Sequence, residues 1–257
     1  DEAAAQIEDF REWLGRLAAR YQSIPLESVR GTPRAELRSS KDKKPVVVWN
    51  VGRRCNLRCI HCYSQSNDQD YSGELTTEEG FALIDDLSQY GSPVLLFSGG
   101  EPLMRPDIYE LIGHARSKGM RAVLSTNGTL ITKDVAKRLK ELDLSYVGIS
   151  LDGLQHIHDS FRGKKGAFTE AMEGLRNCKE VGIKVGLRFT INKKNVDDIP
   201  GIFQLLRDED IPRVCFYHLV YSGRGTEIIK EDLSHEETRA TVDLLMRETK
   251  KLFDEGL

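Results

Sequence analysis

Three cysteines with the spacing Cys55-x-x-x-Cys59-x-x-Cys62 place three thiol groups on one short segment. Iron–sulfur clusters are normally held by four cysteines, so three ligands without an evident fourth would leave one iron open to another molecule. A structural zinc site is the alternative, with His61 as its fourth ligand. Because His61 adjoins Cys62, it would strain the tetrahedral geometry. The spacing therefore favours an iron–sulfur cluster.

The chain contains five cysteines, an odd number. Secreted disulfide-rich domains spread an even set of cysteines along the chain, so a closely spaced trio indicates metal chemistry in a reducing compartment. Of the other two cysteines, Cys178 falls at core spacing on an expected helix and Cys215 lies inside an expected strand. We expect both to be small buried hydrophobic residues rather than ligands.

A second chemically suggestive segment is Ser98-Gly99-Gly100-Glu101-Pro102. Two glycines let a backbone approach a ligand closely, and the Glu101 carboxylate can accept a hydrogen bond from a ligand ammonium group. The alternative is a strand-ending turn with a surface glutamate. Two further segments carry short polar side chains that can hydrogen-bond a ribose or a carboxylate, although such residues are also ordinary turn formers. They are Ser125-Thr126-Asn127-Gly128 and Ser150-Leu151-Asp152-Gly153.

The elements that must position these residues alternate regularly from Pro45 onward. Short β-branched runs, expected as strands, lie near residues 46–51, 94–98, 122–125, 146–150, 184–190 and 214–220. Helical periodicity follows near residues 77–90, 106–118, 133–142, 167–181, 199–207 and 235–253. Thr76 with Glu79 three positions later forms a capping box at the start of the first of these helices. Strands alternating with helices predict parallel βαβ units.

Each expected strand ends in a polar or glycine-rich segment. In parallel barrels the loops that follow the strands form one face, and active sites lie there. We therefore predict an α/β fold, a partial (β/α)6 TIM-like barrel whose mouth gathers all of these segments. A doubly wound sheet is the alternative that spacing alone leaves open. The six segments are residues 55–62, 98–102, 125–128, 150–153, 188–192 and 218–225.

The first 44 residues differ from the rest of the chain. Residues 3–21 carry apolar side chains at helical spacing, which predicts an amphipathic helix, and residues 23–44 read as a linker. We expect an N-terminal extension over 1–44 and a core domain over 45–257.

Composition narrows the class of protein. Lysine and arginine number 37 against 40 acidic residues, a net charge of −3, which argues against charge-driven nucleic-acid binding. No apolar run is long enough to cross a bilayer and no basic-then-apolar leader opens the chain, so we expect a cytoplasmic protein without a membrane span.

The cysteine segment and the Gly99-Gly100-Glu101-Pro102 segment together resemble the radical S-adenosylmethionine (SAM) superfamily. The resemblance implies one [4Fe–4S] cluster on the three cysteines, with its open iron binding S-adenosyl-L-methionine. It further implies an enzyme that cleaves SAM reductively to a 5′-deoxyadenosyl radical, with reduced ferredoxin or flavodoxin as electron donor. The positions that match SAM-contacting residues of the family are His61, Gly99, Gly100, Glu101, Asn127, Ser150, Arg162 and Leu219.

Longer stretches, at residues 40–50, 73–80, 92–106 and 216–225, are similar to the tetrapyrrole-modifying subfamily. This resemblance implies removal of acetate side chains from didecarboxysirohaem in alternative haem biosynthesis, giving iron-coproporphyrin III. Members usually continue into a cysteine-rich extension with an auxiliary cluster, and no cysteine follows Cys215 here. The alternatives are a radical SAM peptide-maturation enzyme and a non-catalytic iron–sulfur or zinc scaffold.

A tetrapyrrole is apolar in its middle and anionic at its rim. Arginine and lysine side chains near the expected mouth would pair with its carboxylates, and aromatic residues after the last strand would stack on or ligate the iron macrocycle. The cations are Arg53, Arg54, Arg105, Arg188, Lys193 and Arg224, and the aromatic residues are Tyr217, His218 and Tyr221.

Overall fold

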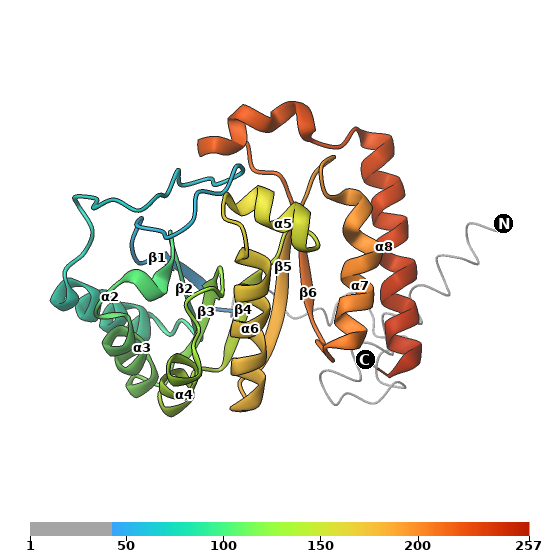
Figure 1. Ribbon diagram of the computed structural model, residues 1–257. Coiled ribbons are helices and arrows are strands. Elements are labelled where there is room, and N and C mark those ends of the chain that lie inside the picture. The colour runs from blue at the N-terminus through green and yellow to red at the C-terminus, as the bar shows by residue number, and fades with distance from the viewer. Residues whose placement is uncertain (1–42, 257) are drawn as a thin grey trace. The chain divides into compact units, whose positions relative to one another are not determined.

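The computed structural model describes residues 43–256 and contains one six-stranded sheet (Figure 1). Every strand runs parallel to its neighbour, and the strand order follows the chain order from β1 to β6. A doubly wound sheet would reverse its strand order at a switch point, so this order identifies a partial barrel. The strands are β1 (Val47–Asn50), β2 (Val94–Ser98), β3 (Arg121–Thr126), β4 (Tyr146–Ser150), β5 (Val185–Ile191) and β6 (Val214–His218).

The helices that connect the strands cover one face of the sheet (Figure 1). They are α2 (Thr77–Tyr90), α3 (Ile108–Ser117), α4 (Lys133–Glu141), α6 (Ala167–Glu180) and α7 (Ile199–Asp208), and α8 (His235–Glu255) follows β6. Three short 3-10 segments, η4 (Pro102–Met104), η5 (Val196–Asp198) and η6 (Gly223–Glu231), occupy loops. The capping box predicted at the start of α2 is confirmed, because the Thr76 side chain accepts from Glu79 N and the Glu79 carboxylate accepts from Thr76 N.

Alternation along each strand separates the packed core from the interior of the barrel. Leu95, Phe97, Leu124, Ile149 and Leu187 are fully buried, and alternation along the strands puts them on the face of the sheet opposite the residues that line the cavity. The residues between them face the barrel interior, because successive strand residues point to opposite faces. The interior set that lines the cavity described below comprises Val48, Leu96, Ser98, Ser125, Ser150, Arg188, Thr190 and Tyr217.

A helix that the sequence did not predict, α5 (Gln155–Arg162), follows β4. It ends at Arg162, and the next residue, Gly163, has a φ of 66°, the left-handed conformation that terminates helices. Two contacts from outside the helix hold it: Asp152 N donates to His158 Nδ1, and Ile60 N donates to the Phe161 carbonyl. A helix of only eight residues is marginal alone, so tertiary contacts explain why local periodicity did not reveal it.

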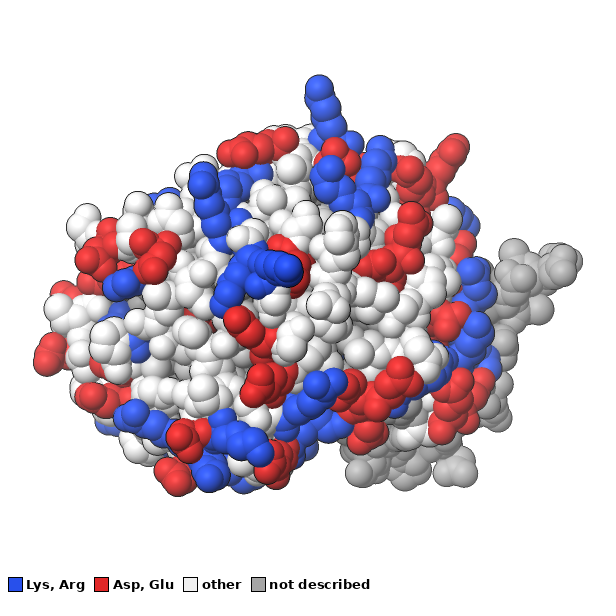
Figure 2. Space-filling model, in the orientation of Figure 1, with Lys and Arg blue, Asp and Glu red and all other residues white. Residues whose placement is uncertain are grey.

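Residues Lys44–Asp243 form one compact unit, which contains the whole sheet. The helix predicted over residues 3–21 and the linker after it lie outside the described residues, so the domain boundary near residue 44 stays a prediction. None of the helices described is both long enough and apolar enough to span a bilayer. Figure 2 shows acidic and basic side chains interspersed over the face viewed in Figure 1, as the small net charge suggests.

Candidate radical SAM site

A cavity of about 300 Å³ lies inside the partial barrel and reaches the C-terminal ends of its strands. Every one of the six strand-end segments contributes to its lining, so the predicted convergence on one mouth is confirmed. The lining residues used below are Cys55, Cys59, His61, Cys62, Gly99, Gly100, Asn127, Ser150, Asp152, Arg162, Arg188, Tyr217, His218 and Val220.

The cysteine-bearing loop after β1 is tied to distant parts of the chain. Arg224, in η6, donates from Nε to the Cys59 carbonyl at 2.7 Å and from Nη2 to the Ser66 carbonyl at 2.9 Å. Arg54 at the start of the loop pairs with Asp68 near its end. These bonds hold the loop in a defined conformation although it contains neither helix nor strand.

Each of the three thiols lies near a nitrogen donor. Ser66 N lies 3.4 Å from Cys62 Sγ, Arg162 Nη1 lies 3.4 Å from Cys59 Sγ, and Asn127 Nδ2 lies 4.0 Å from Cys55 Sγ. Hydrogen bonds to cysteine sulfur are the environment in which proteins hold iron–sulfur clusters and adjust their potentials. The donor set therefore fits a cluster ligated by Cys55, Cys59 and Cys62.

Protonation of the thiols depends on their surroundings. Burial raises the pKa of Cys55 to about 12, and it also raises the pKa of Cys59. Burial acts the same way on Cys62, but hydrogen bonds with Ser64 and Ser66 outweigh it and lower its pKa. Binding of iron would displace the thiol protons. No three His, Cys, Asp or Glu side chains within residues 43–256 are arranged as ligands of a single metal ion.

The two glycines after β2 allow this loop to pack on the cysteine loop. A Cβ on Gly100 would lie 2.3 Å from the Arg54 carbonyl oxygen, and one on Gly99, whose φ is +141°, would lie 2.3 Å from the Gly52 carbonyl oxygen. Gly100 N donates to the Gly52 carbonyl and Glu101 N donates to the Arg54 carbonyl. The close backbone approach that these glycines allow is, in the structure, an approach to the cysteine loop, and their approach to a ligand stays a prediction.

The Glu101 carboxylate is buried, and Glu101 is not among the residues that line the cavity. It accepts hydrogen bonds from Thr126 Oγ1 at 2.8 Å, from Asn127 N at 2.8 Å and from Leu103 N at 3.1 Å. These bonds join the loop after β2 to the loop after β3. The contact with a ligand ammonium group stays a prediction.

Arg162, the last residue of α5, is buried beside the cysteines. Its Nη2 lies 2.5 Å from Asp152 Oδ2, in the loop after β4, and its Nη1 contacts Cys59. Burial lowers the pKa of this guanidinium, but Asp152 together with Cys59 and Cys55 outweighs burial and the pKa is raised. The sequence proposed Arg162 for a SAM carboxylate, and it gave the segment with Asp152 as a possible ligand contact or an ordinary turn. It did not predict that Arg162 pairs with Asp152. The Ser150-Leu151-Asp152-Gly153 segment was the available signal.

The remaining predicted SAM contacts differ in their placement. His61 and Ser150 line the cavity, and His61 Nε2 lies 3.4 Å from Asp152 Oδ2 while its buried Nδ1 has no hydrogen-bond partner among the described residues. Asn127 also lines the cavity, and its Nδ2 donates to Asn56 Oδ1 at 2.8 Å. Leu219 is buried and not part of the lining, whereas Val220 beside it is. The adenine contact of Leu219 stays a prediction.

The other two cysteines have different environments. Cys178 is fully buried, as predicted, and burial raises its pKa to about 12. Cys215 is only half-buried, because it faces the barrel interior from β6, so the prediction that it is a buried core residue was wrong.

Comparison with known proteins identifies the class. Residues 49–206 match the family model of the radical SAM superfamily, and the chain belongs to this superfamily. Its members bind a [4Fe–4S] cluster and SAM, and the cavity with its three thiols fits both. A solved structure of anSMEcpe with bound AdoMet and a peptide superposes with a TM-score of 0.69 at 21% identity, covering 82% of this chain and 61% of that one. This likeness confirms the fold.

Within the superfamily, two of the relatives that the chain resembles have names that refer to tetrapyrrole synthesis. It is 65% identical over 220 residues to the Fe-coproporphyrin III synthase of Methanosarcina barkeri, covering 86% of this chain and 55% of that protein. It is 44% identical over 226 residues to the pre-heme d1 synthase of Dinoroseobacter shibae, covering 88% of this chain and 54% of that protein. The chain thus spans about half the length of these relatives.

Proposed function

We propose that this chain carries the radical SAM core of an enzyme that removes acetate side chains from didecarboxysirohaem and yields iron-coproporphyrin III. The observation that carries the proposal is the 65% identity, over most of the chain, to an Fe-coproporphyrin III synthase. The cavity supports it, because cationic and aromatic side chains line it together with the three cysteines.

In this proposal Cys55, Cys59 and Cys62 hold the cluster, with SAM at its open iron. The two together supply, when bound, a 5′-deoxyadenosyl radical that abstracts hydrogen from an unactivated carbon. The task of the protein is to position the cluster and SAM and to shield them from solvent. Arg162 and Asp152 orient Cys59, and the polar groups of Asn127 and Ser150 face the space for SAM.

We also propose reduced ferredoxin or flavodoxin as the electron donor and the cytoplasm as the location. A cluster that must be reduced in each turnover needs a one-electron donor of low potential. A reducing compartment also protects free thiols from disulfide formation.

The test uses protein reconstituted anaerobically with iron and sulfide. Didecarboxysirohaem should bind, seen as a change in its absorption spectrum, and should accelerate formation of 5′-deoxyadenosine from SAM in the presence of dithionite. Cys59→Ala, which lacks one cluster ligand, should not form 5′-deoxyadenosine. If didecarboxysirohaem neither binds nor accelerates SAM cleavage, the proposal is wrong.

A peptide substrate is the competing outcome. The chain is 35% identical over 184 residues to the mycofactocin maturase MftC of Mycobacterium tuberculosis. Acceleration of SAM cleavage by a precursor peptide, and not by didecarboxysirohaem, would favour that function.

A further inference from the structure

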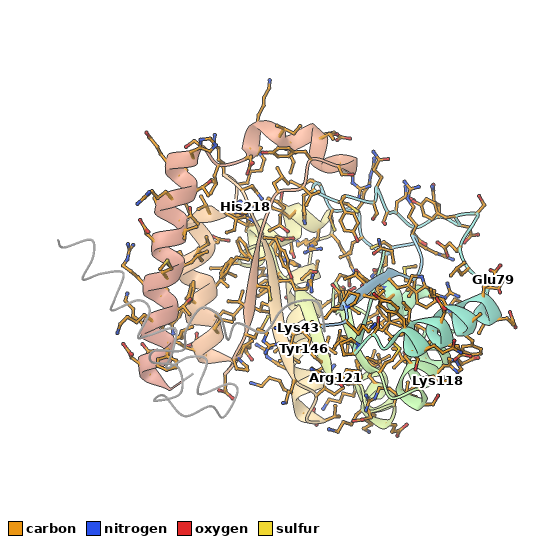
Figure 3. All side chains as sticks on the ribbon, turned by 180° about the vertical axis from the view of Figure 1, so that it is seen from behind. Lys43, Glu79, Lys118, Arg121, Tyr146 and His218 are labelled. Atoms are coloured by element: carbon orange, nitrogen blue, oxygen red, sulfur yellow. The ribbon has the colours of Figure 1, made fainter. Side chains whose placement is uncertain are left out.

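Arg188 stands inside the barrel on β5. By register its Cα neighbours Ser150 on β4 and Cys215 on β6, and its side chain lines the same cavity as the cysteines. In Figure 3, His218 marks the C-terminal end of the strands and Tyr146 and Arg121 mark the opposite end. Arg188 is the middle residue of β5 (Val185–Ile191) and pairs with Ser150, the last residue of β4.

One glycine makes room for this side chain, and a second makes room for Tyr146. Gly148 and Gly186 are paired across β4 and β5. A Cβ on Gly148 would lie 3.0 Å from Arg188 Cδ, and one on Gly186 would lie 2.3 Å from the Tyr146 hydroxyl oxygen. Larger residues at these two positions would displace Arg188 and Tyr146 from the barrel interior.

The other cations proposed for the mouth already have partners. Arg54 pairs with Asp68, Arg105 pairs with Asp107, and Lys193 pairs with Glu237. Arg53 donates to the Ser64 carbonyl, and Arg224 holds the Cys59 and Ser66 carbonyls. These five side chains stabilise loops. Of the six cations predicted near the mouth, Arg188 is therefore the one left to bind a ligand.

The Arg188 guanidinium has no acidic partner in the part of the chain that the structure describes. Its Cζ lies 4.9 Å from the centre of the Tyr217 ring, a cation–π contact that leaves its N–H groups available. Burial raises the pKa of Tyr146 to about 12 and also raises that of Tyr217, whose hydroxyl is hydrogen-bonded with Cys215, so both phenols are neutral near neutral pH. A half-buried guanidinium beside two phenols is a strong site for a carboxylate.

The opposite side of the cavity is apolar. Val48 on β1 and Leu96 on β2 line it, and Val48 is 59% exposed although it faces the barrel interior. The cavity therefore has an exposed apolar wall at Val48 and Leu96 and a cationic wall at Arg188 on its opposite side. A ligand that fits both has an apolar body with a carboxylate at its edge.

We propose that Arg188 binds one carboxylate side chain of the iron-tetrapyrrole substrate through its guanidinium fork, with the macrocycle facing Val48 and Leu96. This assignment rests on the function proposed above. Arg188 thereby sets the rotational position of the macrocycle relative to the cluster, and so determines which side chain is presented for reaction. The SAM carboxylate is the other possible source of this group, and the test separates the two.

The test compares Arg188→Gln and Arg188→Lys with Arg121→Gln, a matched control at the opposite end of the sheet. Cluster-loaded proteins are titrated, by absorbance, with Fe-coproporphyrin III and with its tetramethyl ester, and separately with SAM. Arg188→Gln should bind the free acid about 10- to 100-fold more weakly than the wild type, as expected for a lost charged hydrogen bond. The preference for acid over ester should shrink by the same factor.

Arg188→Lys keeps the positive charge but lacks the guanidinium fork. Its affinity for the free acid should therefore lie between that of Arg188→Gln and that of the wild type. Arg121→Gln should match the wild type, and circular dichroism and iron content should report equal folding of all variants. Equal affinity of Arg188→Gln and wild type for the free acid would overturn the assignment and leave the proposed function standing. Weaker SAM binding with unchanged acid binding, or equal weakening for acid and ester, would also overturn it. A wild type that binds SAM but neither porphyrin would overturn the proposed function itself.

Discussion

The guanidinium of Arg162 lies 2.5 Å from the carboxylate of Asp152, and both side chains are buried beneath the cysteine loop. The same guanidinium contacts Cys59 Sγ at 3.4 Å. The charge next to this thiol is therefore neutralised within the protein. Each of these two buried charges would lack a counterion without the other. The pair therefore links α5 to the loop after β4.

Replacement of Asp152 by asparagine should destabilise the protein strongly. It leaves the buried Arg162 charge without its counterion, a loss worth about 3–5 kcal/mol in the free energy of unfolding. Denaturant unfolding measures it. Asp70→Asn is the control, because Asp70 is 95% exposed and its pairing with Arg54 should contribute little. Equal stability of Asp152→Asn and wild type would contradict this account of the pair.

Iron content should separate the ligand cysteines from the structural one. Cys55→Ala, Cys59→Ala and Cys62→Ala should each lose most of the bound iron and sulfide after reconstitution, because each removes a ligand of a three-cysteine site. Cys178→Ala should keep wild-type iron content, since Cys178 is fully buried on α6. Iron and sulfide per chain are measured directly. Full iron in any of the three loop variants would remove that residue from the ligand set.

Adding one methyl group at Gly100 should disrupt the cysteine loop. The new Cβ would lie 2.3 Å from the Arg54 carbonyl oxygen and 2.4 Å from the Arg53 carbonyl oxygen, both backbone atoms that cannot rotate away. We expect Gly100→Ala to lower cluster incorporation and the thermal midpoint. Gly113→Ala, within α3, meets only the flexible end of Leu142 at 3.3 Å and should be neutral or gain up to about 1 kcal/mol. Similar behaviour of both variants would refute the steric argument.

The Arg105–Asp107 pair should give a pH-dependent contribution to stability. Burial raises the pKa of Asp107, but hydrogen bonds from Arg105 and Thr77 outweigh it, and the pKa lies below its ordinary value. A lowered folded-state pKa stabilises the protein above the unfolded pKa of about 4, and this is lost as the pH falls through the folded value.

Asp107→Asn should therefore cost about 1.5–3 kcal/mol at neutral pH, and the gap to wild type should close below about pH 4. Urea unfolding of both proteins, from neutral pH to below about pH 4, measures the difference in their free energies of unfolding. Taking this difference removes the contribution of the other acidic groups, which both proteins share. A gap that stays constant with pH would show that the Asp107 charge contributes nothing.

The sequence alone predicted a parallel α/β fold and the set of segments at its mouth, and the strand order of the structure decided for a partial barrel over a doubly wound sheet. Alternating hydrophobic periodicities placed all six strands and six of the helices within a few residues, because strands and amphipathic helices carry their burial pattern locally. The polar segments after the strands predicted a shared cavity, since parallel strands end at one edge. Cys55, Cys59 and Cys62 were recognisable because ligand spacing on one loop is itself a local feature.

Tertiary structure decided what the sequence left open. Helix α5 forms because His158 and Phe161 are held by distant partners, and Glu101 turns toward Asn127 because packing brings two loops together. The partners of the cations were also set by the fold: Arg162 pairs with Asp152, whereas Arg188, inside the barrel, has no acidic partner among residues 43–256. The sequence shows which residues carry a charge. Only the fold determines whether an opposite charge or an open cavity lies next to each of them.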